Sequence, residues 1–112
     1  MTQPLPGFLP AQCRRIVVKI GSALLVDPAG QVRENWLRTV TRDIAARRAA
    51  GQQVIVVSSG AIALGARRLS LAKGGRGSLE DAQAAAAVGQ IALSQIWAML
   101  LGEEGITAAQ ML

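Results

Sequence analysis

The chain has 112 residues, of which 51% are hydrophobic, so it is long enough for one small domain with a single core. Cys13 is the only cysteine and histidine is absent, which excludes an intrachain disulfide and the usual zinc and haem sites and is typical of the reducing cytoplasm. The formal net charge is +5. Its arginines occur in separate pairs, namely Arg14 and Arg15, Arg47 and Arg48, and Arg67 and Arg68. This spacing favours a solvated surface, and we expect no nucleic-acid partner.

Residues 1–13 are expected to form a flexible leader. Met1–Gln12 is interrupted by prolines and lacks the basic start of a secretory signal. The most apolar segment, Ile91–Leu101, is too short to cross a bilayer and contains Ser94 and Gln95. We therefore expect that segment to be a buried helix, and we expect no membrane partner.

The first predicted elements form a strand, a helix and a second strand. Ile16–Ile20 is a largely β-branched run, which predicts a buried strand. Glu34–Ala50 has apolar residues at helical spacing, with Asn35 as a candidate cap and Gly51 as a signal for the helix end. Val54–Val57 predicts a second buried strand, and continuous apolar strands are typical of parallel sheets covered on both faces.

Two further helices are predicted after the second strand. Ala61–Leu69 is expected to be a short helix, the glycine-rich Lys73–Ser78 a mobile surface loop, and Glu80–Gly102 the longest helix. The apolar stripe of the long helix is predicted to consist of Val88, Ala92, Ile96 and Met99. Gly89 is expected to thin this helix where another element approaches it. Ile106–Leu112 is expected to start a third strand.

These elements predict an α/β fold, a parallel sheet with helices on both faces that is incomplete in this chain. Right-handed crossovers between two strands leave apolar strand edges and helix faces that further elements would cover. We expect a homo-oligomer for the same reason.

The first candidate functional residue is Lys19, which lies inside a predicted strand directly before the Gly21-Ser22 turn. Burying a lysine in a sheet is costly unless the ammonium group has an anionic partner. A ligand phosphate is one such partner. An internal carboxylate, or exposure of the side chain at a sheet edge, explains the residue equally well.

The second candidate is the turn Ser58-Ser59-Gly60, which connects a strand to a helix. Such a turn directs backbone N–H groups and a helix N-terminus at one point, which suits a phosphate or a carboxylate. An ordinary strand-to-helix turn, with Gly60 allowing close packing, is the alternative. Because adjacent parallel strands open onto one crevice, Lys19, Gly21, Ser22, Ser59 and Gly60 are expected to converge there. The patterns of a Walker A loop and a dinucleotide fingerprint are missing at these turns.

Three segments, in this order and spacing, resemble the glutamate 5-kinases, a family of amino acid kinases: Ile16–Ser22, Val56–Ile62 and Ala86–Gln90. The resemblance implies that residues 14–112 are the N-terminal part of an amino acid kinase domain, a three-layer sandwich. It implies ATP-dependent phosphorylation of the γ-carboxylate of L-glutamate to L-glutamyl 5-phosphate, the first step of proline biosynthesis, with Mg²⁺ accompanying ATP.

The same resemblance implies roles for individual residues. Lys19 would be catalytic and contact the ATP phosphates, and Ser59 would bind glutamate. Gly21, Ser22 and Gly60 would donate backbone N–H groups to phosphate.

The family's remaining glutamate-binding Asp and Asn residues, its adenine-binding segment and its second catalytic lysine have no counterpart in these 112 residues. The chain by itself is therefore expected to be inactive. Three alternatives stay open: the kinase half of a bifunctional pyrroline-carboxylate synthase, a non-catalytic anion- or nucleotide-binding or assembly module, and a small basic nucleic-acid binder.

Overall fold

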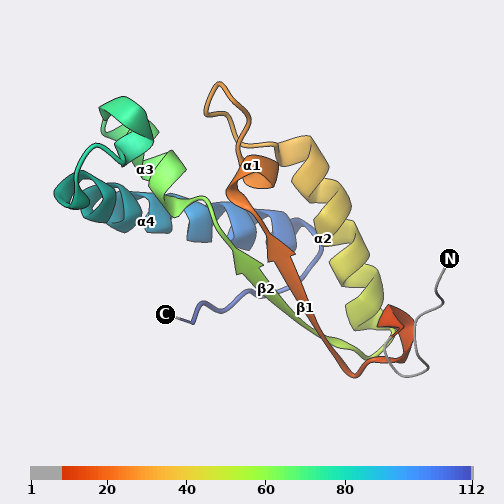
Figure 1. Ribbon diagram of the computed structural model, residues 1–112. Coiled ribbons are helices and arrows are strands. Elements are labelled where there is room, and N and C mark those ends of the chain that lie inside the picture. The colour runs from red at the N-terminus through yellow and green to blue at the C-terminus, as the bar shows by residue number, and fades with distance from the viewer. Residues whose placement is uncertain (1–8, 112) are drawn as a thin grey trace, which may run out of the picture.

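A computed structural model describes residues 9–111 of the chain (Figure 1). The elements, in chain order, are the 3-10 helix η1 (Pro10–Gln12), strand β1 (Arg15–Ile20), helices α1 (Ser22–Leu25) and α2 (Glu34–Ala49), strand β2 (Gln53–Ser58), helix α3 (Ala61–Arg68), the 3-10 helix η2 (Ala72–Gly75) and helix α4 (Leu79–Glu103). Both predicted strands and all three predicted helices are confirmed, whereas the short helix α1 was not predicted.

Strands β1 and β2 form a two-stranded parallel sheet, with α2 as the crossover between them. The register runs from Arg15 opposite Gln53 to Ile20 opposite Ser58. The backbone N–H of Ser59 extends this ladder by donating to the Ile20 carbonyl, at 2.9 Å. The carboxyl ends of the two strands therefore lie side by side, as a parallel pair requires.

One face of the sheet carries the hydrophobic core. Leu37 and Ile44 of α2 join Leu93, Trp97 and Leu100 of α4 in one buried cluster, against which the sheet residues Val18, Val54 and Val56 pack. The other face is open, because the side chain of Val17 is 61% exposed and that of Val57 is 49% exposed. The prediction of buried strands is therefore wrong for this face, and within residues 9–111 the cover of a second helical layer stays a prediction.

Helices α3 and α4 approach each other more closely than ordinary side chains allow. A Cβ atom built on Gly65 of α3 would lie 1.7 Å from the carbonyl oxygen of Ala85, and one built on Gly89 of α4 would lie 1.6 Å from that of Ala61. The pairing is reciprocal, since each helix has one glycine and one alanine four residues apart facing the other. The expected close approach at Gly89 is confirmed, and Gly65 is its partner.

The buried face of α4 differs from the predicted stripe. Ala92 is buried as expected, but Met99 is 44% exposed. The buried positions are Ala85, Gly89, Ala92, Leu93, Trp97, Leu100 and Leu101. The crossing with α3 fixes the rotation of the helix at Ala85 and Gly89, and the core face continues from there with helical periodicity.

The starts of α2 and α4 differ from the sequence-based predictions, whereas the glycine signal after α2 agrees with them. The predicted cap Asn35 lies inside α2, where its side-chain oxygen accepts a hydrogen bond from Arg38 at 3.3 Å, and the cap position is Arg33. Helix α4 begins after Ser78, whose hydroxyl accepts from the backbone N–H of Asp81 at 3.1 Å. Gly51 follows the end of α2 with a positive φ of 87°, as its predicted role requires.

The segments outside the long elements also differ from expectation. Residues 106–111 form no strand, although Ile106 packs against the core, and Leu112 lies outside the described residues. Within the predicted leader, residues 1–8 are not described, so its flexibility stays a prediction. Pro10–Gln12 forms η1, and the buried Gln52 side chain donates to the carbonyls of Pro10 and Cys13.

Helix α4 is long and apolar enough to cross a membrane by length and composition, with a mean hydropathy of 1.6 over an 18-residue window. The prediction had considered only Ile91–Leu101, which is part of this 25-residue helix. A single helix of this kind is weak support for a membrane span, because the core helix of a soluble protein passes the same test.

An ion-pair group connects α2 to the end of α4. Arg38 donates to both carboxylate oxygens of Glu103, at 3.0 and 3.2 Å, and lies 3.5 Å from Glu34 on its own helix. The hydrogen bond from Arg38 holds the pKa of Glu103 below its usual value, and the same bond raises the pKa of Arg38. The group is solvent-exposed, so its contribution to stability is small.

Replacing Gly65 with Ala is expected to destabilise the chain by about 1–3 kcal/mol or more, because a methyl group must force two helix backbones apart. Gly102→Ala is the matched control, since that glycine also lies inside a helix, α4, and a Cβ there meets nothing within 4 Å. The control is expected to change stability by less than about 1 kcal/mol, in the stabilising direction. Urea unfolding followed by circular dichroism measures both, and equal stability of the two variants would contradict the close crossing.

Glu103→Gln is expected to reduce the loss of stability in acid. A carboxyl with a lowered folded-state pKa contributes stability above its unfolded pKa, near 4.5, and that contribution disappears as the pH falls through the folded value. The free energy of unfolding, measured from neutral pH to about pH 3, should therefore depend less on pH in this variant. Asp43→Asn, which removes an exposed carboxylate of α2 with no ion pair among residues 9–111, is the control for the loss of one negative charge. A Glu103→Gln variant with the same pH dependence as the parent chain would contradict the role of the ion pair.

Candidate functional site

The carboxyl ends of the two strands open into a groove with a volume of about 1000 Å³. The turn after α1 forms one wall, and α3 with the segment after it forms the other. The polar and charged side chains along the groove are Ser22, Asp27, Ser58, Ser59, Arg67, Ser70, Lys73 and Arg76. Three cations therefore face a single carboxylate, a charge balance that favours an anionic ligand.

The Ser58-Ser59-Gly60 turn forms the base of this groove. Gly60 has a φ of 115° and precedes the first turn of α3. A Cβ atom on Gly60 would lie 2.4 Å from the Cδ2 atom of Leu25, so the turn needs glycine both for its backbone conformation and for packing. The packing explanation of Gly60 is thus supported, and the first N–H groups of α3, which have no partner within the helix, are compatible with anion binding as well.

The two serines of the turn differ in their hydrogen bonding. The Ser58 hydroxyl donates to the backbone carbonyl of Ser59 at 3.1 Å. The Ser59 side chain is exposed, and its hydroxyl makes no hydrogen bond to any other residue between 9 and 111. Ser59 is therefore the hydroxyl of this turn that is available to a ligand.

Lys19 lies at the same end of the sheet but outside the groove. It pairs with Val57 in the register, and its side chain is exposed on the open face of the sheet. Within the described part of the chain no carboxylate lies within ion-pair distance of its ammonium group. The alternative of an internal carboxylate partner is thus excluded for residues 9–111, while exposure is confirmed.

The predicted convergence is confirmed in part. Ser22, Ser59 and Gly60 line the groove, whereas Lys19 and Gly21 do not. Gly21 has an ordinary extended conformation, with a φ of −74°, and a Cβ there would meet nothing within 4 Å. No group of three or more Cys, Asp or Glu side chains in residues 9–111 could hold a metal ion.

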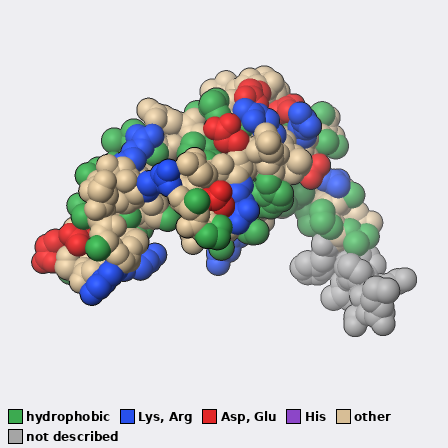
Figure 2. Space-filling view, turned by 90° about the horizontal axis from the view of Figure 1, so that it is seen from above, with side chains coloured by type: hydrophobic (Ala, Val, Ile, Leu, Met, Phe, Trp, Pro, Cys, Tyr) green, Lys and Arg blue, Asp and Glu red, His purple; other side chains and the backbone are tan. Residues whose placement is uncertain are grey.

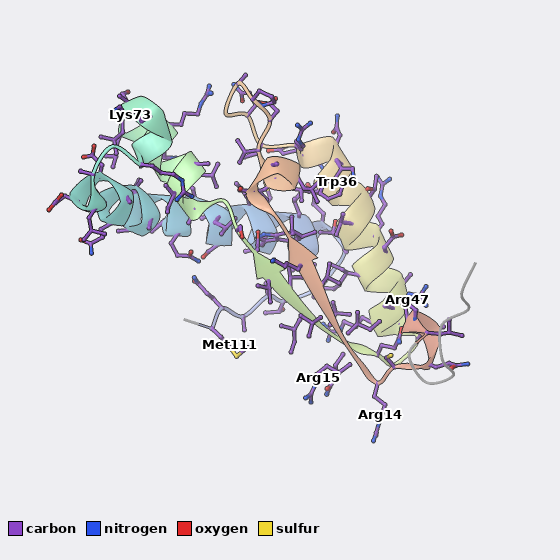
Figure 3. All side chains as sticks on the ribbon, viewed as in Figure 1. Arg14, Arg15, Trp36, Arg47, Lys73 and Met111 are labelled. Carbon is purple, nitrogen blue, oxygen red and sulfur yellow. The ribbon has the colours of Figure 1, made fainter. Side chains whose placement is uncertain are left out.

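Sequence reasoning missed the cations of the groove. Arg67 was assigned to a surface pair, and Lys73 and Arg76 to a surface loop. Their spacing after a turn that already suggested an anion site is the signal that could have found them. On the face seen from above, the basic side chains form separate patches and no continuous stripe (Figure 2). Arg14 and Arg15 lie at the far end of the sheet from Lys73 (Figure 3).

A parallel βαβ unit with a cationic groove at its strand ends defines the α/β class of protein, in which ligands bind at that edge of the sheet. The chain belongs to the amino acid kinase family, whose sequence model matches residues 14–112.

Several curated relatives are similar to the chain over nearly its whole length. It is 75% identical over 105 residues to a protein named glutamate 5-kinase from Sphingopyxis alaskensis, a match that covers 94% of this chain and 28% of that protein. Proteins of the same name from Novosphingobium aromaticivorans and Zymomonas mobilis are 69% and 66% identical, over 89% and 94% of this chain, and the match covers 26% of each. The chain thus spans about a quarter of the length of these relatives.

The two glycines of the strand-end turns are expected to respond differently to alanine. Gly60→Ala should destabilise the chain by about 1–3 kcal/mol, because the turn then has both a strained φ and a clash with Leu25. Gly21→Ala should be tolerated, within about 1 kcal/mol of the parent chain and in the stabilising direction. Thermal unfolding followed by circular dichroism distinguishes the two, and a tolerated Gly60→Ala would show that the left-handed turn is not required.

Proposed function

We propose that the chain is the N-terminal part of a glutamate 5-kinase, which transfers the γ-phosphoryl group of ATP to the γ-carboxylate of L-glutamate. The products are L-glutamyl 5-phosphate and ADP, and the reaction is the first step of proline biosynthesis in the cytoplasm. The observation that carries the proposal is the identity of 75% over 105 residues to a relative of that name, together with the cationic groove at the strand ends. The groove lies at the position where parallel sheets bind their ligands.

The reaction brings two anions together, so the site has to offset their repulsion and the charge that develops on the transferred phosphoryl group. In the proposal Ser59 binds glutamate through its free hydroxyl. Gly60 and Ser22 line the same groove and offer backbone N–H groups to phosphate, as does Gly21, which follows β1 outside the groove. Arg67, Lys73 and Arg76 add positive potential along the groove.

Lys19 is the proposed catalytic residue, and it contacts the ATP phosphates from the open face of the sheet. Its ammonium group has no carboxylate partner in residues 9–111, so its charge is available to a phosphate group. The Lys19 side chain lies one strand position before the turn that leads to Ser22, and its register partner Val57 lies two residues before Ser59. A phosphate chain that extends from the open face to the strand ends would therefore pass Lys19 first and Ser59 next.

Mg²⁺ accompanies ATP in this proposal. No acidic cluster in the described residues fits the ion, so we assign no residue to it and derive no step from it. We further propose that the complete domain is a three-layer sandwich and a homo-oligomer. This proposal is supported by hydrophobic side chains that are exposed in this chain, namely Val17 and Val57 on the sheet and Ile91 on α4. Further elements or a second subunit would bury them.

The test uses a hybrid in which this chain replaces the matching 105 residues of the relative from Sphingopyxis alaskensis. The hybrid is expected to phosphorylate L-glutamate, and Lys19→Met is expected to lower kcat by about 10²–10³-fold, because a charge that acts on the transition state is lost. Coupled measurement of ADP release with glutamate and ATP varied separately gives kcat and both KM values.

Arg15→Met is the matched control for Lys19. It lies on the same face of the same strand, four residues earlier, and among residues 9–111 its side chain bonds only to Gln53 on the neighbouring strand. Its kcat should stay within about twofold of the parent hybrid. A hybrid that binds ATP without turnover would overturn the proposed kinase activity and favour a non-catalytic module, and an unchanged kcat in Lys19→Met would remove that residue from catalysis.

A further inference from the structure

Arg67 connects the two walls of the groove. It lies in the last turn of α3, and its Nη1 atom donates a hydrogen bond to the carbonyl oxygen of Ala29, a residue 38 positions earlier in the turn after α1. Among residues 9–111 this is the only hydrogen bond between residues 26–32 and the opposite wall formed by α3 and the segment after it. This hydrogen bond therefore contributes to the width of the groove at this point.

Gly30 provides a second, independent contact with the same side chain. It has a φ of 81°, and a Cβ atom built on it would lie 2.6 Å from Nη1 and 3.0 Å from Cδ of Arg67. The guanidinium group and its stem thus lie flat against the backbone of Gly30, in a space that a side chain at this position would occupy. The contact involves packing as well as the hydrogen bond to Ala29.

The turn held by Arg67 has its own internal hydrogen bonds, so a contact at one of its residues restrains the whole turn. Val26 and Val32 form an antiparallel bridge at its base. The backbone N–H of Asp27 donates to the Gln31 carbonyl at 2.8 Å, and the Asp27 carboxylate accepts from the backbone N–H of Gln31 at 2.9 Å. Fixing Ala29 therefore fixes the whole wall.

We propose that Arg67 is a positioning residue for glutamate: it holds the Asp27–Gln31 turn against α3 and so sets the width of the groove in which Ser59 binds the substrate. This inference rests on the proposed function. Ser59 and residues 27–30 line the same groove, whereas Lys19, the proposed contact of ATP, lies outside it. Loss of Arg67 should therefore affect glutamate binding more than ATP binding or the transfer step.

The kinetic test uses the hybrid enzyme with Arg67→Met, which keeps an unbranched side chain and removes the donor. The KM for glutamate is expected to rise by about three- to tenfold, the net effect of losing one hydrogen bond, while kcat and the KM for ATP stay within about twofold. Arg68→Met is the matched control, an exposed neighbour at the same helix end, and should change none of the three. An unchanged KM for glutamate in Arg67→Met would overturn the proposal.

A double-mutant cycle separates the contact from a general loss of stability. Gly30→Ala displaces the guanidinium group, so it should raise the KM for glutamate by itself and add little to Arg67→Met. Fully additive effects on that KM would contradict a shared contact. A variant that was merely less stable would lower the melting temperature and the active fraction, and hence kcat, with KM unchanged.

Hydrogen exchange provides a readout that does not need activity. In the 112-residue chain, the amides of Gly30 and Gln31 should exchange faster in Arg67→Met than in Arg68→Met, because both are protected by bonds inside the turn. Equal exchange would overturn the tether. If the unsubstituted hybrid does not phosphorylate glutamate, the proposed function fails, whereas an active hybrid with an unchanged glutamate KM overturns the role of Arg67 alone.

Discussion

The close crossing of α3 and α4 is the constraint on which the candidate site depends. Gly89 lies against the carbonyl of Ala61, and Ala61 directly follows the Ser59-Gly60 turn. The position of the turn is therefore fixed by packing against α4, a helix that begins at Leu79, 19 residues after Gly60. The third segment of the family resemblance, Ala86–Gln90, contains Gly89, so this segment supports the second one by packing, while its Ala86 lines the groove.

The open face of the sheet is the second consequence of this arrangement. Because α2 and α4 both contribute to the core on one side, Val17 and Val57 stay exposed on the other, and Lys19 is exposed beside them. A lysine on a face of this kind keeps its hydration, so it costs little in this chain. Further cover of the face would raise that cost, and an anionic ligand at the ammonium group would then offset it.

The pattern of strands and helices could be predicted from the sequence because its signals are local. A β-branched run, the helical spacing of apolar residues and the helix-ending Gly51 each determine structure within a few residues. Features set by tertiary contacts could not. The rotation of α4, which exposes Met99, follows from the crossing at Gly65 and Gly89. The exposure of Lys19 depends on which face the helices cover, and the contact of Arg67 with Ala29 joins residues that no local pattern connects.

The arrangement also separates the two binding tasks of the proposed reaction. The groove with Ser59 lies between the turn after α1 and α3, while Lys19 lies on the open face of β1, and the two meet only where the strands end. A phosphoryl transfer between two anions needs each of them held on its own side, with the reacting oxygens approaching at one point. The parallel pairing of β1 and β2 supplies that point, since it brings Ile20 and Ser59 to adjacent positions through a backbone hydrogen bond of 2.9 Å. The rigid element of the site is thus the sheet edge, and the walls on either side determine what can reach it.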